Sequence, residues 1–355
     1  MKTNKPRVLD IFCGAGGFSE GFRQAEYEIV AGIDNDTQAL QTYGHNFGSK
    51  KAILWDLARA CDLTKSPEKK NIFKKIDVII GGPPCQGFSI AGKRKASDPR
   101  NELYRAYFDL IKCIKPKAVV IENVPTMKSL FGGSYFHSIV GDLEKIGFEV
   151  SHEILSAEKY GIPQKRRRLI IVGVLKKLAP FSFPKPVQGD RQITCREAIS
   201  DLPLLEGSAG ADEMPYHRPP ENHYQKTIRN GCHVLTNHWA VIHTEKTKKI
   251  ISMVPDGGNY KSLPEKLWPT RKVNIAWTRM NSNSPCFTID AGHNHHFHYK
   301  ANRVPTVREC ARIQSFPDHF VFIGNKTSQF RQVGNAVPPV LGREIANALL
   351  RVINE

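Results

Sequence analysis

Short apolar runs alternate with amphipathic segments through the first half of the chain. Six runs are typical of buried strands, at residues 8–12, 28–33, 52–55, 78–80, 118–121 and 169–174. Segments with helical periodicity lie between them, for example at 104–114 and 136–146. Strands that alternate with helices indicate βαβ units. We therefore predict an α/β fold with a doubly wound, mainly parallel sheet, whose ligands bind at the carboxyl ends of the strands.

The pattern changes after residue 175. A proline-rich stretch follows, and residues up to about 322 lack the alternation, whereas residues 340–352 again have helical periodicity. The chain has 355 residues, which exceeds the size at which a single core usually stops growing. We predict one domain from residues 1–178 and 323–355, and a second, smaller domain from residues 179–322.

The composition indicates a soluble protein with a polyanionic partner. The chain carries 51 Lys and Arg against 34 Asp and Glu, a net charge of +17, which favours phosphate binding. A merely basic soluble surface explains the same charge. No apolar run approaches the roughly 18 residues that span a bilayer, and no signal segment opens the chain. We expect a cytoplasmic protein, and the eight cysteines without a Cys-x-x-Cys pair indicate reduced thiols.

One cysteine stands out by its flanking residues. Residues 81–89 read Gly-Gly-Pro-Pro-Cys-Gln-Gly-Phe-Ser and follow a predicted strand directly. A single cysteine is more often a small core residue. Two prolines before Cys85 restrict its backbone at the end of a strand, where ligands bind. Cys85 is therefore a candidate nucleophile.

A glycine-rich turn follows the first strand and opens a helix. Such a turn lets the backbone approach a ligand at a helix N-terminus, although a purely structural turn is the alternative. Asp34 ends the second strand about 20 residues later, where a carboxylate can accept hydrogen bonds from ribose hydroxyls. Asp56 follows the third strand and could accept from an adenine amine. The two carboxylates favour an adenosine-bearing ligand, while the spacing Gly14-x-Gly16-Gly17 differs from that of dinucleotide sites.

Six short blocks occur in one order along the chain. They are Asp-x-Phe-x-Gly-x-Gly-Gly at 10–17, Pro-Cys-Gln at 84–86, Glu-Asn-Val at 122–124, Gln-x-Arg-x-Arg at 164–168, Arg-Glu-x-x-Arg at 308–312 and Gly-Asn-x-Val-Pro at 334–338. In these blocks the chain resembles the DNA (cytosine-5)-methyltransferases of bacterial restriction-modification systems. The resemblance implies a Rossmann-like, class I S-adenosylmethionine-dependent catalytic domain and a target-recognition domain.

The resemblance also implies a reaction, in which a methyl group passes from S-adenosylmethionine to C5 of a flipped-out cytosine in duplex DNA. Carbon C5 is a poor nucleophile until a group adds to C6, and the resemblance assigns that addition to Cys85. It assigns Glu122 to N3 and the exocyclic amine, Arg168 to O2, and Arg166 to the thiolate and a backbone phosphate. Taken singly, Glu122 could cap a strand end, and the basic run could be a solvated face.

The resemblance extends to the cofactor and DNA contacts. The cofactor residues it implies are Phe12, Ala15, Gly17, Asp34, Asn35, Asp56, Leu57, Gly82, Pro84, Leu103, Asn335 and Val337. Asn35 replaces an aromatic or apolar residue common in the family, and Asn335 taken singly would serve a turn. The DNA contacts it implies are Ser89, Lys93, Arg94 and Lys95 on a loop that closes over the DNA, and Thr288 and Ile289 in the second domain. A mobile charged loop without a DNA contact would explain the three basic residues equally well.

Two other activities fit some of these features. A tRNA cytosine-5 methyltransferase shares the scaffold but carries a smaller second domain, and a catalytically silent DNA-binding protein would not need the four catalytic residues. Histidines at positions 293, 295, 296 and 298 invite a metal site, but no cysteine or acidic partner lies near them in sequence. We expect no metal. A monomer that acts on double-stranded DNA, with a restriction endonuclease for the same site, is the expected setting.

Overall fold

The computed structural model describes residues 5–56, 72–83, 99–187, 191–270, 277–290 and 296–354. The chain forms two compact units, each with its own core. Unit 1 comprises Met1–Ser156, Arg167–Pro186 and Pro339–Glu355, and unit 2 comprises Ala157–Arg166 and Val187–Pro338. The boundaries between the catalytic and the target-recognition domains, expected near residues 178 and 323, stay a prediction.

Unit 1 contains a seven-stranded sheet in the order β3-β2-β1-β4-β5-β7-β6. Its strands are β1 (Arg7–Ile11), β2 (Glu28–Asp34), β3 (Ala52–Leu54), β4 (Val78–Gly81), β5 (Ala118–Asn123), β6 (Phe148–Ser156) and β7 (Arg167–Leu175). The first five strands in this order, from β3 through β2, β1 and β4 to β5, pair in parallel. Strand β7 runs antiparallel to both of its neighbours, β5 and β6. The predicted α/β fold with a mainly parallel, doubly wound sheet is confirmed.

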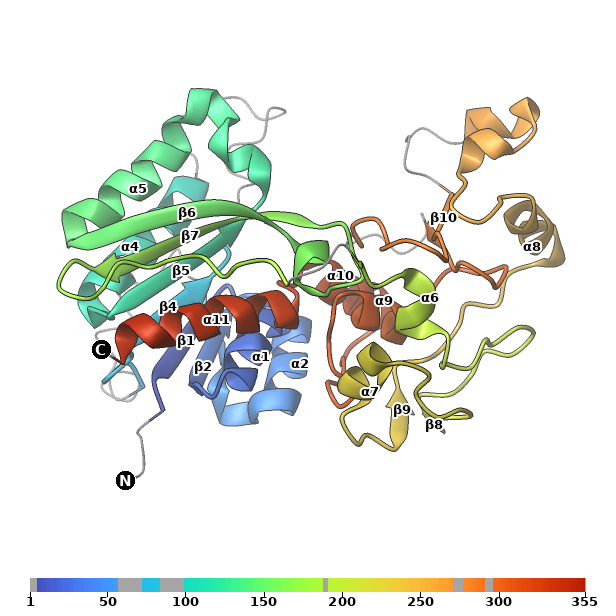
Figure 1. The fold of residues 1–355 in the computed structure, drawn as a ribbon, viewed down its shortest axis with the longest axis horizontal. Coiled ribbons are helices and arrows are strands. Elements are labelled where there is room, and N and C mark those ends of the chain that lie inside the picture. The colour runs from blue at the N-terminus through green and yellow to red at the C-terminus, as the bar shows by residue number, and fades with distance from the viewer. Residues whose placement is uncertain are drawn as a thin grey trace. The chain divides into compact units, whose positions relative to one another are not determined.

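Helices cover both faces of this sheet (Figure 1). They are α1 (Gly17–Gln24), α2 (Thr37–Phe47), α4 (Pro99–Ile114), α5 (Ser134–Ile146) and α11 (Pro339–Ile353). Leu9 and Ile11 share a core with side chains of α4 and α5, whereas Asp10 between them accepts a hydrogen bond from Ser19 of α1. Because side chains alternate along a strand, α1 lies on the opposite face from α4 and α5.

Helix α11 brings the C-terminal segment back onto unit 1. It lies along α1, and a Cβ added at Gly21 would lie 2.5 Å from the Pro339 carbonyl oxygen. The Tyr27 hydroxyl donates to the Ala346 carbonyl at 3.0 Å. The close approach of α1 and α11 therefore depends on a glycine at position 21.

Strand β6 was not among the predicted strands. It occupies the edge of the sheet, and of its nine residues only Phe148 and Leu155 are buried. An edge strand with few buried side chains lacks the apolar run that marked the others. The short 3-10 turns of both units are η1 (Ser49–Lys51), η4 (Pro125–Lys128), η5 (Leu130–Gly133), η6 (Ala157–Tyr160), η7 (Tyr260–Ser262) and η8 (Glu265–Thr270).

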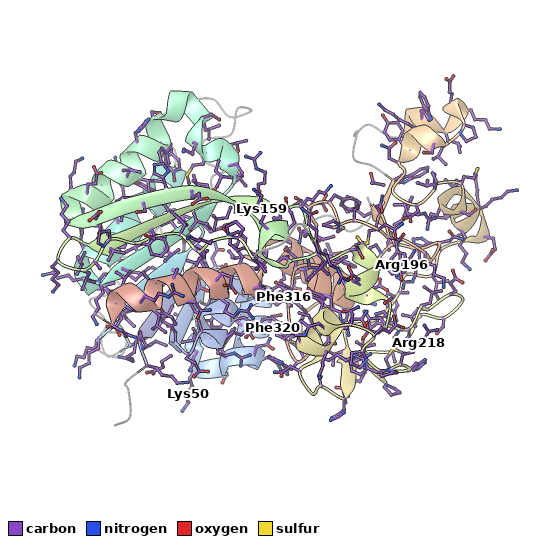
Figure 2. All side chains as sticks on the ribbon, in the orientation of Figure 1. Lys50, Lys159, Arg196, Arg218, Phe316 and Phe320 are labelled. Atoms are coloured by element: carbon purple, nitrogen blue, oxygen red, sulfur yellow. The ribbon has the colours of Figure 1, made fainter. Side chains whose placement is uncertain are left out.

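Unit 2 is built from short elements. Its helices are α6 (Cys195–Ile199), α7 (His223–Arg229), α8 (Glu245–Ser252), α9 (Val307–Ile313) and α10 (Lys326–Asn335), and its strands are β8 (Glu213–Pro215), β9 (Val234–Thr236), β10 (Thr278–Arg279) and β11 (His296–Phe297). Phe316, Phe320 and Phe322 are buried and pack together with ring centroids 4.8–5.3 Å apart. Figure 2 labels the first two, together with Arg196 and Arg218, which are exposed basic residues of the same unit.

Buried arginines join the elements of unit 2. Arg312, on α9, donates to Asp201 at 2.5 Å and to Asp318 at 2.7 Å, and Arg303 donates to both oxygens of Glu309. Removing one partner of such a pair leaves a buried charge uncompensated. The block at 308–312 is therefore part of the framework of unit 2. Among the residues that the structure describes, no helix has the length and apolar character needed to cross a membrane.

Candidate active site

The glycine-rich turn between β1 and α1 has a backbone that few residue types adopt. Phe12 has φ 61°, and Gly14 and Gly16 have φ of 51° and 99°. A Cβ at Gly16 would lie 2.5 Å from the Phe47 ring, whereas the space beside Gly14 is open. Helix α1 begins at Gly17 without a side-chain cap, so its first turn is suited to a ligand that accepts hydrogen bonds.

Asp34, at the end of β2, ties this turn to the next one. Its Oδ2 accepts from the Gly14 N–H at 2.8 Å, and its Oδ1 accepts from the N–H groups of Asn35 and Asp36 at 2.8 and 2.9 Å. Burial raises the pKa of Asp34 above its usual value. A carboxylate offers about four acceptor positions, so one remains for a ligand after the three backbone bonds.

A second carboxylate, which was not among the predicted site residues, lies fully buried behind the turn. Asp10 accepts a hydrogen bond from the Ser19 hydroxyl at 2.7 Å, and Ser19 lies 2.9 Å from the Tyr43 hydroxyl. Burial raises the pKa of Asp10 to about 7. This chain of hydrogen bonds joins β1, α1 and α2 underneath the glycine turn.

Glu122 and Arg168 form an ion pair at the end of the sheet where the parallel strands finish. Arg168 Nε lies 2.7 Å from Glu122 Oε1, and the two side chains are only 14% and 12% exposed. Glu122 comes from the end of β5 and Arg168 from the start of β7. The antiparallel register, which sets Glu122 opposite Ile170, brings these two ends together.

The end of β4 is fastened to the same place. Asn123 Nδ2 donates to the Pro83 carbonyl at 2.9 Å, and a Cβ added at Gly82 would lie 3.1 Å from Glu122 Oε2. The chain that leads toward Cys85 therefore leaves β4 beside Glu122. The predicted site residues Leu57, Pro84, Cys85, Ser89, Lys93, Arg94 and Lys95 lie outside the described residues.

The other predicted cofactor residues of unit 1 differ in exposure. Ala15 and Gly17 are buried in the turn, and Asn35 and Asp56 are exposed at the ends of β2 and β3. Phe12 stacks on Tyr107 with ring centroids 6.3 Å apart, and Leu103 packs against the core under α4. Phe12, Gly17 and Asp34 thus share one end of the sheet.

Arg166 lies in unit 2 and is 1% exposed. Its Nη2 donates to the Ala336 carbonyl at 3.0 Å, and its Nη1 donates to the Ile289 carbonyl at 3.4 Å. Ala336 lies between Asn335, which is exposed, and Val337, which is buried. Unit 2 therefore brings together Arg166, the predicted DNA contact Ile289 and the predicted cofactor residues near its C-terminal end.

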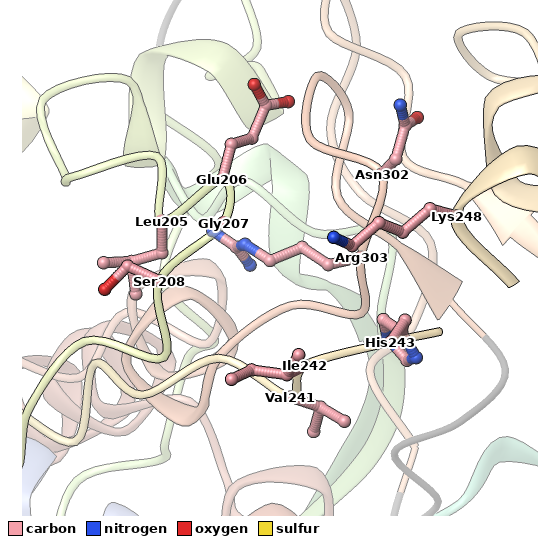
Figure 3. A pocket seen from close by; sticks show the side chains of 10 residues that line it. All are labelled: Leu205, Glu206, Gly207, Ser208, Val241, Ile242, His243, Lys248, Asn302 and Arg303. Atoms are coloured by element: carbon pink, nitrogen blue, oxygen red, sulfur yellow. The ribbon is translucent and has the colours of Figure 1, made fainter. Parts of the chain in front are cut away.

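Unit 2 also contains a pocket of about 220 Å³ (Figure 3). Three of its polar side chains already bind groups of the protein: Arg303 pairs with Glu309, Lys248 lies 2.8 Å from Glu245, and His243 Nε2 accepts from the Val304 N–H at 3.3 Å. Burial lowers the pKa of His243. These internal bonds are typical of a structural hollow.

The histidine cluster has no metal-binding geometry among the described residues. His296 and His298 are buried, and residues 293 and 295 are outside the described part. Burial lowers the pKa of His298 to about 3, and its Nδ1 accepts from the N–H groups of Lys300 and Ala301. Within the described ranges, no group of three or more His, Cys, Asp or Glu side chains is placed to hold a metal ion.

Comparison with known proteins identifies the family of this chain. A family model of C-5 cytosine-specific DNA methylases matches residues 6–351. The chain belongs to this family. It is 35% identical over 347 residues to the Type II methyltransferase M1.HphI of Haemophilus parahaemolyticus, covering 97% of this chain and 86% of that protein. The identity to the Type II methyltransferase M.DdeI of Desulfomicrobium norvegicum is also 35%, over 96% of this chain and 88% of the relative.

A solved structure has the same fold. It is a prophage-encoded protein of E. coli, assigned as a DNA modification methyltransferase, with 25% identity, a TM-score of 0.81 and coverage of 99% of this chain and 100% of its own. The protein is thus a DNA cytosine-5 methyltransferase with the class I methyltransferase fold. Family and fold imply S-adenosylmethionine as the methyl donor and DNA as the substrate.

Proposed function

We propose that this methyltransferase modifies one cytosine in a specific duplex sequence, through a transient bond between Cys85 and C6 of a flipped-out base. The observation that carries this proposal is the Glu122–Arg168 ion pair. It lies beside the end of β4, from which the chain proceeds to Cys85. When a thiolate adds to cytosine, negative charge develops in the ring. An acid at N3 and a fixed cation at O2 would stabilise this charge.

We assign a step to each group, as the resemblance to the family implies. The Cys85 thiolate adds to C6, and the electron pair of the C5–C6 double bond moves toward C5 and N3. Glu122, in its protonated form, donates a hydrogen bond to N3 or transfers its proton there, and Arg168 holds O2. Carbon C5 then takes the methyl group, and S-adenosylhomocysteine is left as the product. The proton on N3 returns to Glu122, a base removes the C5 proton, and the thiolate leaves as the double bond reforms. Base flipping costs a few kcal/mol of unstacking and unpairing.

The residues of unit 1 fit S-adenosylmethionine, which supplies the methyl group. The space beside Gly14 is open, α1 has no side-chain cap, and Asp34 keeps an acceptor position for a ribose hydroxyl. Phe12, Ala15, Gly17 and Gly82 would line the pocket. Asn35, Asp56, Leu57, Pro84, Leu103, Asn335 and Val337 complete the proposed set.

The DNA contacts belong to the same proposal. Ser89, Lys93, Arg94 and Lys95 would contact the DNA from the loop after Cys85, and Thr288 and Ile289 would contact it from unit 2. Arg166 would lower the pKa of the thiol or bind the backbone phosphate. We place the enzyme in a restriction-modification system, as a cytoplasmic monomer whose partner endonuclease cuts the same sequence. The Type II relatives support the restriction-modification role.

Bisulfite sequencing of plasmid DNA from expressing cells tests the function. We expect protected cytosines at one recurring sequence with the wild-type protein and none with Cys85→Ser. A plasmid without protected cytosines would contradict the proposal. A parallel assay of methyl transfer to duplex DNA and to tRNA separates the two substrates, and preferential labelling of tRNA would favour the alternative.

A further inference from the structure

Gln164 lies at the centre of a hydrogen-bonded contact between two segments of unit 2. Its side chain is fully buried. Its Oε1 accepts from the Ile289 N–H at 2.9 Å, and its Nε2 donates to Gln314 Oε1 at 2.8 Å. An amide that is used as both donor and acceptor has one orientation. Gln164 therefore fixes Ile289 relative to α9 and the residues that follow it.

The backbones of the two segments are paired as well. The Cys286 N–H donates to the Pro163 carbonyl at 2.9 Å, and the Lys165 N–H donates to the Cys286 carbonyl at 2.7 Å. Farther along, the Thr288 hydroxyl donates to the Lys165 carbonyl at 2.7 Å. Residues 286–289 are thus aligned in parallel with residues 163–166.

The same contact holds Arg166. The guanidinium donates to the Ile289 carbonyl, so that both backbone polar groups of Ile289 are bound by side chains of the 163–166 segment. A displacement of Ile289 would remove one of the partners that orient Arg166. The guanidinium would then shift relative to Ala336, its other carbonyl partner.

We propose that Gln164 is a positioning residue for methyl transfer, which couples the segment 286–289 to the guanidinium of Arg166. The inference rests on the proposed function, in which Thr288 and Ile289 contact DNA and Arg166 acts near the reacting thiolate. Displacing a catalytic group by about 1 Å can lower a rate by about 100-fold. Gln164 would therefore affect the reaction rate more than the binding of DNA.

A matched pair of variants tests this role. Gln164→Met keeps the size of the side chain but removes its hydrogen bonds. Gln225→Met is the control, because Gln225 is also fully buried and makes the same kind of bonds. Its Nε2 donates to the Glu197 carbonyl and to Ser200 Oγ, both at 2.9 Å, and its Oε1 accepts from the Glu221 N–H.

Three quantities are measured for each variant: the single-turnover rate of methyl transfer at saturating DNA and S-adenosylmethionine, the Kd for DNA, and the melting temperature. We expect Gln164→Met to lower the rate about tenfold or more while the Kd changes less than about threefold, and Gln225→Met to change the rate less than about twofold. A rate of Gln164→Met that falls by less than about tenfold, or equal decreases in rate in both variants, would overturn the inference. A wild-type protein that does not methylate duplex DNA would refute the proposed function itself.

An exposed residue provides a second test that does not risk the fold. Thr288→Val removes the bond to the Lys165 carbonyl, and Thr227→Val removes a comparable bond from an exposed threonine to the His223 carbonyl. At saturating DNA, coupling lowers the rate of the Thr288 variant by about threefold or more and leaves that of the Thr227 variant unchanged. An unchanged rate for Thr288→Val contradicts the coupling.

Discussion

Arg168 Nε lies 2.7 Å from Glu122 Oε1 at the edge of the unit 1 sheet, where β5 ends and β7 begins. The pair is mostly shielded from water, so the guanidinium holds the carboxyl group in place. In the proposed function, this arrangement exists before the substrate binds. Preorganised polar groups of this kind act strongly where charge develops in a reaction.

Glu122→Gln is expected to slow methyl transfer strongly. The amide cannot supply a proton at N3, and the loss of one acid–base group typically costs about 10² to 10⁴ in rate. Binding of DNA should change little. Single-turnover rates measure the effect, and Glu28→Gln is the control, because Glu28 forms a more exposed pair with Arg7 at 3.5 Å. Equal rates for Glu122→Gln and the wild type would contradict the assignment.

Asp34→Asn is expected to weaken the binding of S-adenosylmethionine by about tenfold or more. The substitution removes one carboxylate oxygen as a hydrogen-bond acceptor, whereas the Gly14 N–H and the ribose hydroxyl each require an acceptor. Asp36→Asn is the matched control. Asp36 caps α2 through the N–H groups of Gln38 and Ala39, and asparagine caps a helix equally well. Calorimetric titration of both variants measures the affinity, and a similar affinity in the two would show that Asp34 does not contact the cofactor.

The pKa of Asp10 predicts a pH dependence of stability. It is raised from 3.8 to about 7 by burial, so the native state binds a proton more tightly than the unfolded chain. The stabilisation is complete below about pH 4 and is lost as the pH rises through about 7. Relative to Asp10→Asn, the wild type should lose about 2–3 kcal/mol of unfolding free energy between pH 5 and pH 8. Urea unfolding at both pH values measures this difference, and a constant difference would place the pKa of Asp10 elsewhere.

The sequence predicted most of the fold but only part of the site. The alternation of apolar runs predicted the parallel strands. Strand β6 was not predicted, because most of its side chains lie outside the core and it has no apolar run. Asp34 was predicted at a strand end, but its bond to the Gly14 N–H depends on how the turn after β1 folds back. Likewise, the block at 164–168 was recognised without a role for Gln164, because its partners lie about 125 and 150 residues away in the chain.

Trapping the covalent intermediate tests the central claim most directly. Duplex DNA with 5-fluorocytosine at the target position is incubated with the protein and S-adenosylmethionine, because fluorine at C5 cannot leave as a proton does. We predict that the wild-type protein forms a complex that survives denaturation and has the mass of protein plus methylated DNA, and that Cys85→Ser forms none. A wild-type protein that methylates normal DNA but forms no such complex would contradict the mechanism, and so would a Cys85→Ser protein that still forms it.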